Sequence, residues 1–513
     1  MPNLVDFSGR PFHFIGIGGI GMSALAYILV KQKIPVSGSD ARSSHITQRL
    51  EQLGAQIFWQ QSATNFDVFR SGVPFATPPA LASDVPLAAM DLATVPEAEA
   101  HSTAPQVLPQ VVCSTAIQAE NPEYQAAVEL GCPILHRSDL LAALMTRSRG
   151  IAVAGTHGKT TTSSLIGYML LQAGIDPTII VGGEVDAWEG NARLGQGPYL
   201  VAEADESDGS LIKLFAELGV ITNIELDHPD HYQSIDGVVE IFEQFTHNCQ
   251  RWVGCLDCPT LRDRLKPDIS YSLDPDRVAD YTVLNPQYTA QGVIATVLER
   301  GEVLGEIQLQ LMGQHNLSNA LAAVAVGRDL GLDFAQIAEG LAGFQGAQRR
   351  FEHRGTEGGI ALYDDYAHHP SEIRATLAAA RQRLSAQAGQ SRVVAIFQPH
   401  RYSRTQTFLE EFAQSFQDAD LVAIADIYAA GEKQVPGLSG QTLADRVAAY
   451  HPEVSYCGSL DNTHQFLSAA LQPGDLALFL GAGNLNQIVP SVLKDLAARA
   501  DRATDDCKTS SAL

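Results

Sequence analysis

The chain carries little positive charge for its length. Its 513 residues include 34 Lys and Arg against 58 Asp and Glu, which leaves a formal net charge of −24 at pH 7. Such a surface repels a nucleic-acid backbone at long range. The composition therefore argues against a nucleic-acid partner.

Long apolar runs and cysteines are also scarce. No stretch reaches the roughly 18 apolar residues of a membrane helix, and the N-terminus lacks a basic segment followed by an apolar run. We therefore expect no membrane partner and a cytoplasmic protein. The 7 cysteines are an odd count in a long chain, which favours reduced thiols over disulfides. Cys255 and Cys258 are spaced like zinc ligands, but no second Cys or His pair at such spacing follows them.

Apolar segments that precede glycine-rich turns indicate the fold class. Hydrophobic residues make up 45% of the chain, and its length predicts about three domains. Strand-like runs at residues 12–15 and 151–154 each lead into a glycine-rich turn and a helical pattern, and similar runs lie at 393–397, 421–424 and 476–480. This order predicts an α/β fold with parallel sheets.

Two segments lack this pattern. Residues 68–110 are rich in Ala and Pro and predict an irregular insertion. Residues 501–513 are polar and predict a frayed tail. The positions of the motifs below predict domain boundaries near residues 147 and 348.

The first glycine-rich turn, GIGGIG at residues 16–21, satisfies the G-x-G-x-x-G pattern between a strand and a helix. Asp40 follows about 20 residues later, as in dinucleotide-binding domains. A helix N-terminus and bare backbone stabilise any pyrophosphate, so the turn fits a UDP-sugar as well as NAD. An NAD-dependent oxidoreductase remains an alternative at this point.

The second turn, GTHGKTTT at residues 155–162, resembles a phosphate-binding P-loop, although two residues rather than four separate Gly155 from Gly158. Backbone N–H groups would hold phosphate, Lys159 the β/γ charge, and the Thr160 hydroxyl Mg²⁺. The alternatives are a glycine-rich turn without function and a regulatory NTPase module.

Acidic residues follow the next apolar strand. The segment YLVAEADESD at 199–208 ends with four carboxylates in its last six residues. Carboxylates that lie so close repel one another unless a cation joins them, so we expect Mg²⁺ that bridges to ATP. A solvated acidic loop is the alternative. Another strand-like segment ends at Asp227 and His228, where His228 is either a metal ligand or an ordinary hydrogen-bonded histidine.

The order of these motifs resembles the central domain of the Mur ligases. Further similar blocks lie at residues 313–320, 349–352, 364–370 and 397–405, and the resemblance covers all but the insertion and the tail. The last two blocks are similar to the branch that joins L-alanine to UDP-N-acetylmuramate. A murein-peptide ligase is a close alternative, against which Arg401 and Arg404 argue. The family's metal-bridging carbamylated lysine is not expected, because residues 225–250 contain no lysine.

The resemblance implies an ATP-dependent ligase of peptidoglycan synthesis that works through an acyl phosphate. It implies a Rossmann-like UDP-substrate domain at 1–147, a central ATP-binding P-loop domain with a mixed and parallel sheet at 148–348, and a Rossmann-like amino-acid domain at 349–500. The expected cofactors are ATP and Mg²⁺, which Mn²⁺ is able to replace, and the expected partners are UDP-N-acetylmuramate and L-alanine.

The same resemblance implies a role for individual residues. The residues expected to bind ATP are Gly155, Thr156, His157, Gly158, Lys159, Thr160, Thr161, Asn316, Asn319 and Arg350. Those expected to bind the UDP-substrate are Gly18, Gly19, Gly21, Asp40 and Ser114. Those expected to bind the amino acid are Tyr366, His368, Arg401 and Arg404. Lys159, Glu203 and His228 are expected to be catalytic, and Thr160, Glu203 and His228 to hold the metal.

Overall fold

The computed structural model describes residues 5–70, 107–385 and 391–510. Most of the predicted insertion at 68–110 therefore lies outside the described residues. The chain forms two compact units, one of Met1–Ser148 with Gly190–Gly195 and the other of Arg149–Glu189 with Gln196–Leu513.

The first unit is built on a parallel five-stranded sheet in the order β3-β2-β1-β4-β5. Its strands are β1 Phe12–Ile15, β2 Val36–Ser39, β3 Gln56–Phe58, β4 Gln110–Cys113 and β5 Ile134–His136. Its helices are α1 Ile20–Lys31, α2 His45–Gln52, α3 Asp67–Arg70, α4 Pro122–Glu129 and α5 Arg137–Met145, and β8 Gly190–Arg193 packs on α1. The central strand β1 is buried throughout, because helices cover both faces of a parallel sheet.

The strand order of this unit places its glycine-rich turn. The chain leaves β1 in one direction for β2 and later returns to the other side of β1 as β4. In open α/β sheets, ligands bind where the strand order reverses in this way. The turn after β1 and the segment after β4 lie at this point, and a Cβ on Gly16 would lie 3.8 Å from Ile117 Cδ1.

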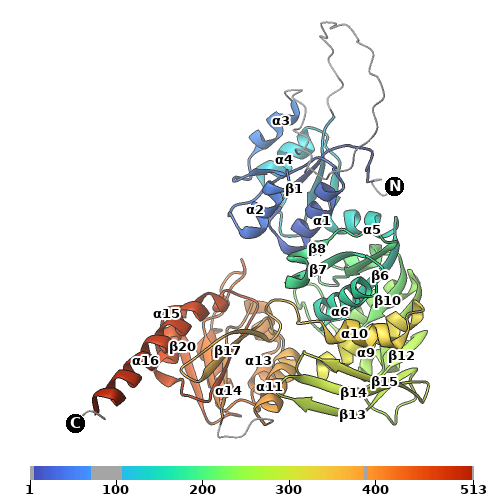
Figure 1. Cartoon of the computed structure of the whole chain (residues 1–513). Helices are drawn as coiled ribbons and strands as arrows, with labels where there is room; N and C mark the ends of the chain where they lie inside the picture. The colour runs from blue at the N-terminus through green and yellow to red at the C-terminus, as the bar shows by residue number, and fades with distance from the viewer. Residues whose placement is uncertain (1–4, 71–106, 386–390, 511–513) are drawn as a thin grey trace, which may run out of the picture. The chain divides into compact units, whose positions relative to one another are not determined.

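The second unit contains two sheets (Figure 1). The larger runs in the order β15-β14-β13-β12-β11-β10-β6-β9-β7, parallel from β7 to β13 and antiparallel from β13 to β15. Its strands are β6 Arg149–Ala154, β7 Thr178–Val185, β9 Tyr199–Glu203, β10 Ala216–Ile221, β11 Cys249–Cys255, β12 Ile269–Tyr271, β13 Tyr281–Thr289, β14 Gly292–Glu299 and β15 Glu302–Leu309. Its helices are α6 Lys159–Gln172, α7 Ile235–His247, α8 Pro259–Arg264, α9 Gln314–Asp329 and α10 Phe334–Ala342.

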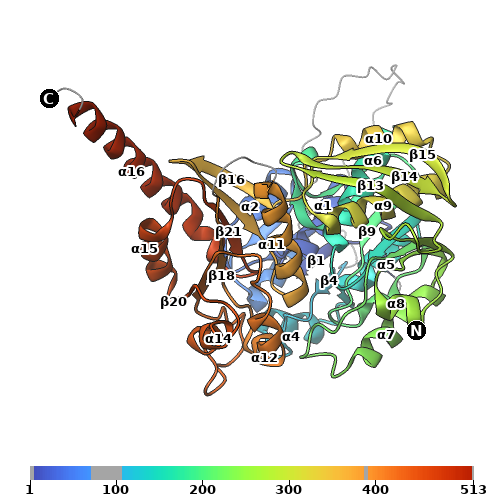
Figure 2. The ribbon, with the colours of Figure 1, turned by 90° about the horizontal axis from the view of Figure 1, so that it is seen from below.

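The last sheet has the order β16-β17-β21-β18-β19-β20, with β16 antiparallel to an otherwise parallel set. Its strands are β16 Glu352–Glu357, β17 Ile360–Asp365, β18 Val393–Phe397, β19 Leu421–Ala425, β20 Val454–Gly458 and β21 Leu476–Leu480. Its helices are α11 Pro370–Ser385, α12 Tyr402–Thr407, α13 Leu409–Ala413, α14 Gly440–Val447, α15 Leu460–Ala470 and α16 Val489–Ser510. Figure 2 shows α11 beside β18 and β21.

The α/β class and its parallel and mixed sheets are confirmed. α16 continues to Ser510, so its helical backbone enters the segment expected to fray. None of the helices in the described ranges combines the length and the apolar character needed to cross a bilayer.

Candidate active site

The glycine-rich turn of the first unit is braced by Asp40. The Gly18 N–H donates to Asp40 Oδ2 at 2.9 Å, and the Arg42 N–H donates to the other oxygen at 3.1 Å. A Cβ on Gly18 would lie 2.7 Å from Asp40 Oδ2, so a larger residue there would displace the Asp40 carboxylate. Gly19 precedes the first residue of α1, Gly21 lies in its first turn, and Ser114 directly follows β4. The structure thus brings the predicted UDP-side residues to one end of the sheet and adds a bracing role for Asp40.

The phosphate loop of the second unit connects β6 to α6, as the sequence predicts. Gly155 has φ +134° and Gly158 φ +82°, conformations that side chains disfavour. The segment after β10 holds the loop in place. Asn223 O accepts from the Thr156 N–H at 3.0 Å, and Asn223 Oδ1 accepts from the His157 N–H at 2.8 Å. The first turn of α6 contains Lys159, Thr160 and Thr161, so its N-terminus is available for anions.

Lys159 is buried against acidic residues. Its Nζ donates to Gly155 O at 2.7 Å, to Thr156 O at 3.1 Å and to the Glu206 carboxylate at 2.9 Å. Burial opposes the charge, but Glu206, Asp205 and Glu203 together raise the pKa of Lys159, so the ammonium stays protonated. Burial raises the pKa of Glu206 to about 7. A cationic donor is therefore held at the entrance of the phosphate loop.

Two of the three predicted metal ligands lie together. The Thr160 hydroxyl donates to Glu203 Oε2 at 2.8 Å, and the Gly182 N–H donates to the same oxygen at 2.7 Å. A hydroxyl beside a carboxylate suits the oxygen preference of Mg²⁺. His228 has φ +53°, and its Nε2 lies 3.6 Å from Asp227 Oδ2 and 3.9 Å from Glu206 Oε1. The oxygen donors of Thr160 and Glu203 therefore fit Mg²⁺, and His228 lies beside Asp227 and Glu206.

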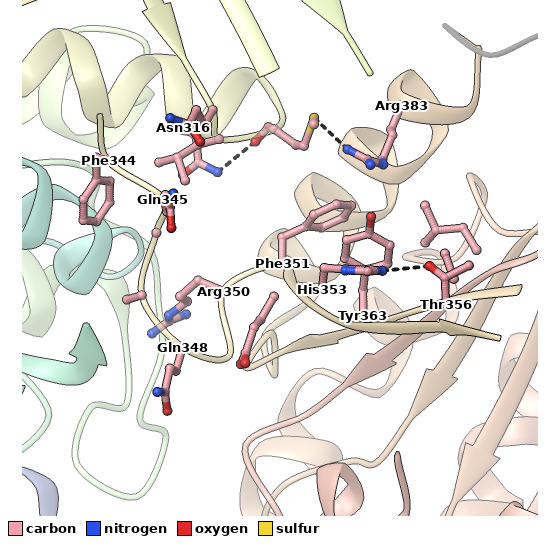
Figure 3. Close-up of a pocket in the computed structure, with 18 of the residues that line it drawn as sticks. Asn316, Phe344, Gln345, Gln348, Arg350, Phe351, His353, Thr356, Tyr363 and Arg383 are labelled. Atoms are coloured by element: carbon pink, nitrogen blue, oxygen red, sulfur yellow. Dashed lines mark hydrogen bonds between the residues drawn. The ribbon is translucent and has the colours of Figure 1, made fainter. Parts of the chain in front are cut away.

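A cavity of about 1020 Å³ lies between α9 and the start of the last sheet (Figure 3). Among the predicted ATP-binding residues, Asn316 and Arg350 line it, together with Phe344, Phe351 and Tyr363. It is large enough to admit a nucleoside. Asn319, which is 6% exposed, connects it to the phosphate loop, because Asn319 Nδ2 donates to Asn316 Oδ1 at 3.2 Å. A Cβ on Gly158 would lie 2.7 Å from Asn319 Oδ1.

The predicted amino-acid residues fall into two pairs. The Tyr366 ring lies 5.0 Å and 5.3 Å from the guanidinium carbons of Arg349 and Arg350. His368 meets the Tyr366 ring edge-on at 5.3 Å. Burial lowers the pKa of His368 to about 3, so its imidazole is neutral.

The two arginines of the amino-acid prediction have different surroundings. Arg401, with φ +68°, donates from Nη1 to the half-exposed Asp230 at 2.8 Å. Arg404 is 3% exposed and donates from Nε and Nη2 to the two oxygens of Asp227 at 2.9 and 3.2 Å. Burial opposes it, yet Arg404 holds the pKa of Asp227 well below its usual range. Arg404 is thus already neutralised, whereas Arg401 has only an exposed partner.

The sequence reasoning did not assign a role to several residues that organise this region. Glu206 pairs with Lys159, Asn223 holds the phosphate loop, and Asp227 pairs with Arg404. Glu372 accepts from the backbone N–H of His368 at 2.9 Å and lies 3.2 Å from His157 Nδ1. The only signal for Glu372 was its place in the first turn after Pro370, where a carboxylate stabilises a helix.

Three segments of the chain match known protein families. Residues 11–149 match the family described as "Mur ligase family, catalytic domain". Residues 153–327 match "Mur ligase middle domain", and residues 349–483 match "Mur ligase, glutamate ligase domain".

Whole-chain relatives agree with these matches. The chain is 61% identical to a UDP-N-acetylmuramate–L-alanine ligase of Gloeothece citriformis, over 96% of this chain and 99% of that protein. It is 62% identical to a ligase of the same name from Nostoc punctiforme, over 96% and 98%.

Solved structures share the fold. The UDP-N-acetylmuramate–alanine ligase of Thermotoga maritima superposes with a TM-score of 0.74 at 27% identity, over 96% of this chain and 99% of that one. A murein peptide ligase of Psychrobacter arcticus gives a TM-score of 0.65 at 22% identity, over 95% and 99%, a likeness of fold alone. The chain belongs to the Mur ligase family.

Proposed function

We propose that this chain joins L-alanine to UDP-N-acetylmuramate at the expense of ATP, as a step of peptidoglycan synthesis. The observation that carries the proposal is about 60% identity, over nearly the whole length, to ligases named for this reaction. The geometry supports it, because the phosphate loop, a cavity large enough for a nucleoside and the predicted amino-acid residues all belong to one compact unit.

The reaction needs an activated carboxylate. A carboxylate of UDP-N-acetylmuramate attacks the γ-phosphorus of ATP, ADP leaves, and an acyl phosphate forms. The amine of L-alanine then attacks the acyl carbon, inorganic phosphate leaves, and the amine loses a proton as the amide forms. Both steps bring anions together, so positive charge that is already in place lowers the barrier.

Residues of the phosphate loop would supply that charge. Lys159 would turn from Glu206 toward the β- and γ-phosphates, while backbone N–H groups at the start of α6 hold the phosphate oxygens. Thr160, Glu203 and His228 would hold Mg²⁺, or Mn²⁺ in its place, which supplies further positive charge when bound. Asn316, Asn319 and Arg350 would place the nucleoside in the cavity.

The amino acid would bind on the residues of the last domain. Tyr366 and the neutral His368 form an edge-on pair beside it, and Arg401 would exchange Asp230 for the L-alanine carboxylate. Arg404 would act from its buried pair with Asp227, which orients its guanidinium. A planar guanidinium suits a small carboxylate.

The first unit would bind the UDP part of the substrate. Gly18, Gly19 and Gly21 would approach the pyrophosphate closely, and Ser114 would reach it from the loop after β4. Asp40 would keep the turn in shape through its bond from Gly18. We also propose the domain limits 1–147, 148–348 and 349–500 and a cytoplasmic location.

One assay tests the proposal. Purified protein is given ATP, Mg²⁺ and UDP-N-acetylmuramate, and phosphate release is measured with L-alanine, with other amino acids and with a cell-wall peptide. We expect release that depends on both UDP-N-acetylmuramate and L-alanine. Preference for the peptide would instead support a murein-peptide ligase. In a separate binding titration, binding of NADH without binding of the UDP-sugar would reject the assignment of the first unit.

A further inference from the structure

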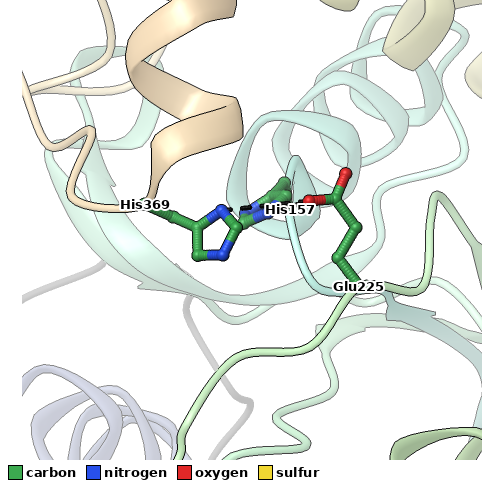
Figure 4. A group of neighbouring side chains, drawn as sticks. All are labelled: His157, Glu225 and His369. Carbon is green, nitrogen blue, oxygen red and sulfur yellow. Dashed lines mark ion pairs between the residues drawn. The ribbon is translucent and has the colours of Figure 1, made fainter. Parts of the chain in front are cut away.

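Outside the predicted Mg²⁺ ligands, two histidines and a glutamate lie together in the second unit (Figure 4). His157 comes from the phosphate loop, Glu225 from the segment after β10, and His369 from the residue before α11. Glu225 Oε2 lies 3.5 Å from His157 Nε2 and 3.9 Å from His369 Nδ1. All three donor atoms lie within 4.8 Å of one another.

The hydrogen bonds of the two rings leave the facing nitrogens as potential donors to a metal. His157 Nδ1 lies 3.2 Å from Glu372 Oε1, so this nitrogen keeps its proton. Because Glu225 and Glu372 also stabilise the imidazolium, a metal ion would displace the proton from His157 Nε2 as it binds. His369 Nε2 lies 3.2 Å from the carbonyl oxygen of Leu226, so here the proton is on Nε2. Metal-binding histidines are oriented in this way, with the second ring nitrogen bonded to a carboxylate or a backbone carbonyl.

The facing nitrogens of the two histidines are buried and weakly bonded, whereas the Glu225 side chain is 41% exposed. His157 Nε2 is buried and has no hydrogen-bond partner within the described structure. His369 Nδ1 accepts only a long 3.3 Å bond from the Ser371 N–H. The Ser371 hydroxyl donates to Glu225 Oε2 at 2.5 Å and so orients the carboxylate.

We propose that His157, Glu225 and His369 form a binding site for a divalent transition metal ion, Zn²⁺ above all. Two imidazoles and one carboxylate are a zinc ligand set that leaves a fourth position open. Zinc bonds of about 2.0–2.2 Å in a tetrahedron separate donor atoms by about 3.3–3.6 Å, so the group needs only a modest contraction. Two imidazole nitrogens favour Zn²⁺ over Mg²⁺, whereas the predicted Mg²⁺ site has a single histidine, His228, beside the oxygen donors Thr160 and Glu203.

The site has a structural consequence. His157 lies in the phosphate loop and His369 directly precedes α11, 212 residues later in the chain (369 − 157). A metal ion bound by both would fix the loop to the last domain. It would therefore restrain the loop independently of which amino acid the enzyme joins.

The test is calorimetric titration of the full-length protein with ZnCl₂ in the absence of nucleotide. We expect one zinc equivalent in the wild type that is weakened at least about 100-fold in Glu225→Gln and in His369→Asn, since even loss of an orienting partner costs 10–100-fold. Ser371→Ala keeps all three ligands and should weaken binding about tenfold. The same equivalent should remain in Glu203→Gln, which alters the predicted Mg²⁺ site.

A matched control comes from another histidine–carboxylate pair. His464 Nε2 lies 3.0 Å from Asp495 Oδ2 on the same unit, so His464→Asn should keep the zinc equivalent. Thermal unfolding of each variant shows whether it is folded. If the ligand variants do not fold, the expected tenfold weakening of zinc binding in Ser371→Ala tests the proposal instead. Wild-type affinity in Glu225→Gln and His369→Asn, loss of the equivalent in Glu203→Gln, or no zinc uptake by the wild type would each overturn the proposal.

Discussion

The ion pair between Lys159 and Glu206 holds the cation of the phosphate loop in place. The ammonium lies 2.9 Å from the carboxylate, and the two side chains are 13% and 3% exposed. Removing one fixed electrostatic donor costs about 10²–10³-fold in kcat. We therefore expect Lys159→Ala to lower kcat for phosphate release by at least that factor.

A second variant separates chemistry from stability in this prediction. Lys159→Ala leaves Glu206 buried without its cation, and breaking a buried pair costs about 3–5 kcal/mol of unfolding free energy. The double variant Lys159→Ala/Glu206→Gln should recover much of the stability, measured by urea unfolding, but not the turnover. Near-normal turnover in either variant would refute the role of Lys159.

Arg401 offers a clean test of amino-acid binding. Its partner Asp230 is half-exposed, and such ion pairs contribute about 0–1 kcal/mol, so Arg401→Lys should leave unfolding nearly unchanged. If Arg401 holds the L-alanine carboxylate, loss of one charge-assisted hydrogen bond of about 1.5 kcal/mol should raise KM for L-alanine about tenfold. The KM for ATP should not move. Parallel shifts in both constants would place the amino-acid pocket elsewhere.

Unlike Arg401, Arg404 should be important for stability. The side chains of Arg404 and Asp227 are 4% and 5% exposed, so Arg404→Ala leaves the Asp227 carboxylate buried without its arginine. We expect the free energy of unfolding to fall by about 3–5 kcal/mol. Adding Asp227→Asn should restore part of this loss. Wild-type stability of Arg404→Ala would show that the pair is not formed in solution.

At the scale of elements, the turn between β6 and α6 depends on glycine. Gly155 has φ +134°, and a Cβ there would lie 2.0 Å from Thr222 Oγ1 and 3.0 Å from the Thr222 backbone nitrogen. Gly174, just after α6, has φ +75° but open space around it. Gly174→Ala should therefore cost only the backbone strain, about 1–2 kcal/mol.

Gly155→Ala should cost more, because the backbone at Thr222, just after β10, must also move. We expect it to abolish ATP binding, measured by calorimetry, whereas Gly174→Ala binds ATP normally. Equal effects of the two substitutions would mean that the close packing at Thr222 is not needed by the loop.

Buried histidines make the stability of the whole molecule depend on pH. Burial lowers the pKa of His368 to about 3 and that of His315, His369 and His400 to about 4. Unfolded histidines titrate near pH 6.5. Between pH 6.5 and 4 the unfolded chain thus binds protons that the folded chain does not, and stability falls as pH falls.

Other groups shape this dependence. Burial raises the pKa of Glu206 to about 7 and that of Asp365 to about 6, which opposes the histidines, but these two carboxylates are outnumbered. Burial opposes the charge on His157, yet Glu225 and Glu372 raise its pKa to about 10. The stabilisation that protonated His157 gives to the folded state is complete below pH 6.5 and is lost as pH rises toward 10.

We therefore expect a maximum of stability near neutral pH. The free energy of unfolding, measured by urea denaturation, should fall by roughly 2–4 kcal/mol from pH 7 to pH 5. His315→Asn should reduce this fall, whereas the exposed His353→Asn should not. A flat profile between pH 5 and pH 7 would contradict the burial of these histidines.

Local patterns of the sequence predict many of the strands, turns and helices of this molecule. Apolar runs followed by glycine predict strand-turn-helix units that begin at residues 12 and 151, and the structure confirms both. Lys159, Thr160 and the acidic segment at 199–208 were placed at one phosphate site, and Thr160 does contact Glu203. The predictions of strand-turn-helix units succeed because hydrophobic period and glycine conformation act over a few residues.

Only the tertiary structure decides which charged side chains pair with one another. The sequence offered Arg401 and Arg404 as equals, but Arg404 pairs with Asp227 across 177 residues, and His157 meets Glu372 across 215. Nothing local distinguishes two arginines three residues apart. Their difference arises because the segment after β10, whose Leu226 packs against the core of the last domain, brings Asp227 to the buried Arg404, whereas Arg401 meets the half-exposed Asp230. That packing depends on the hydrophobic core as a whole.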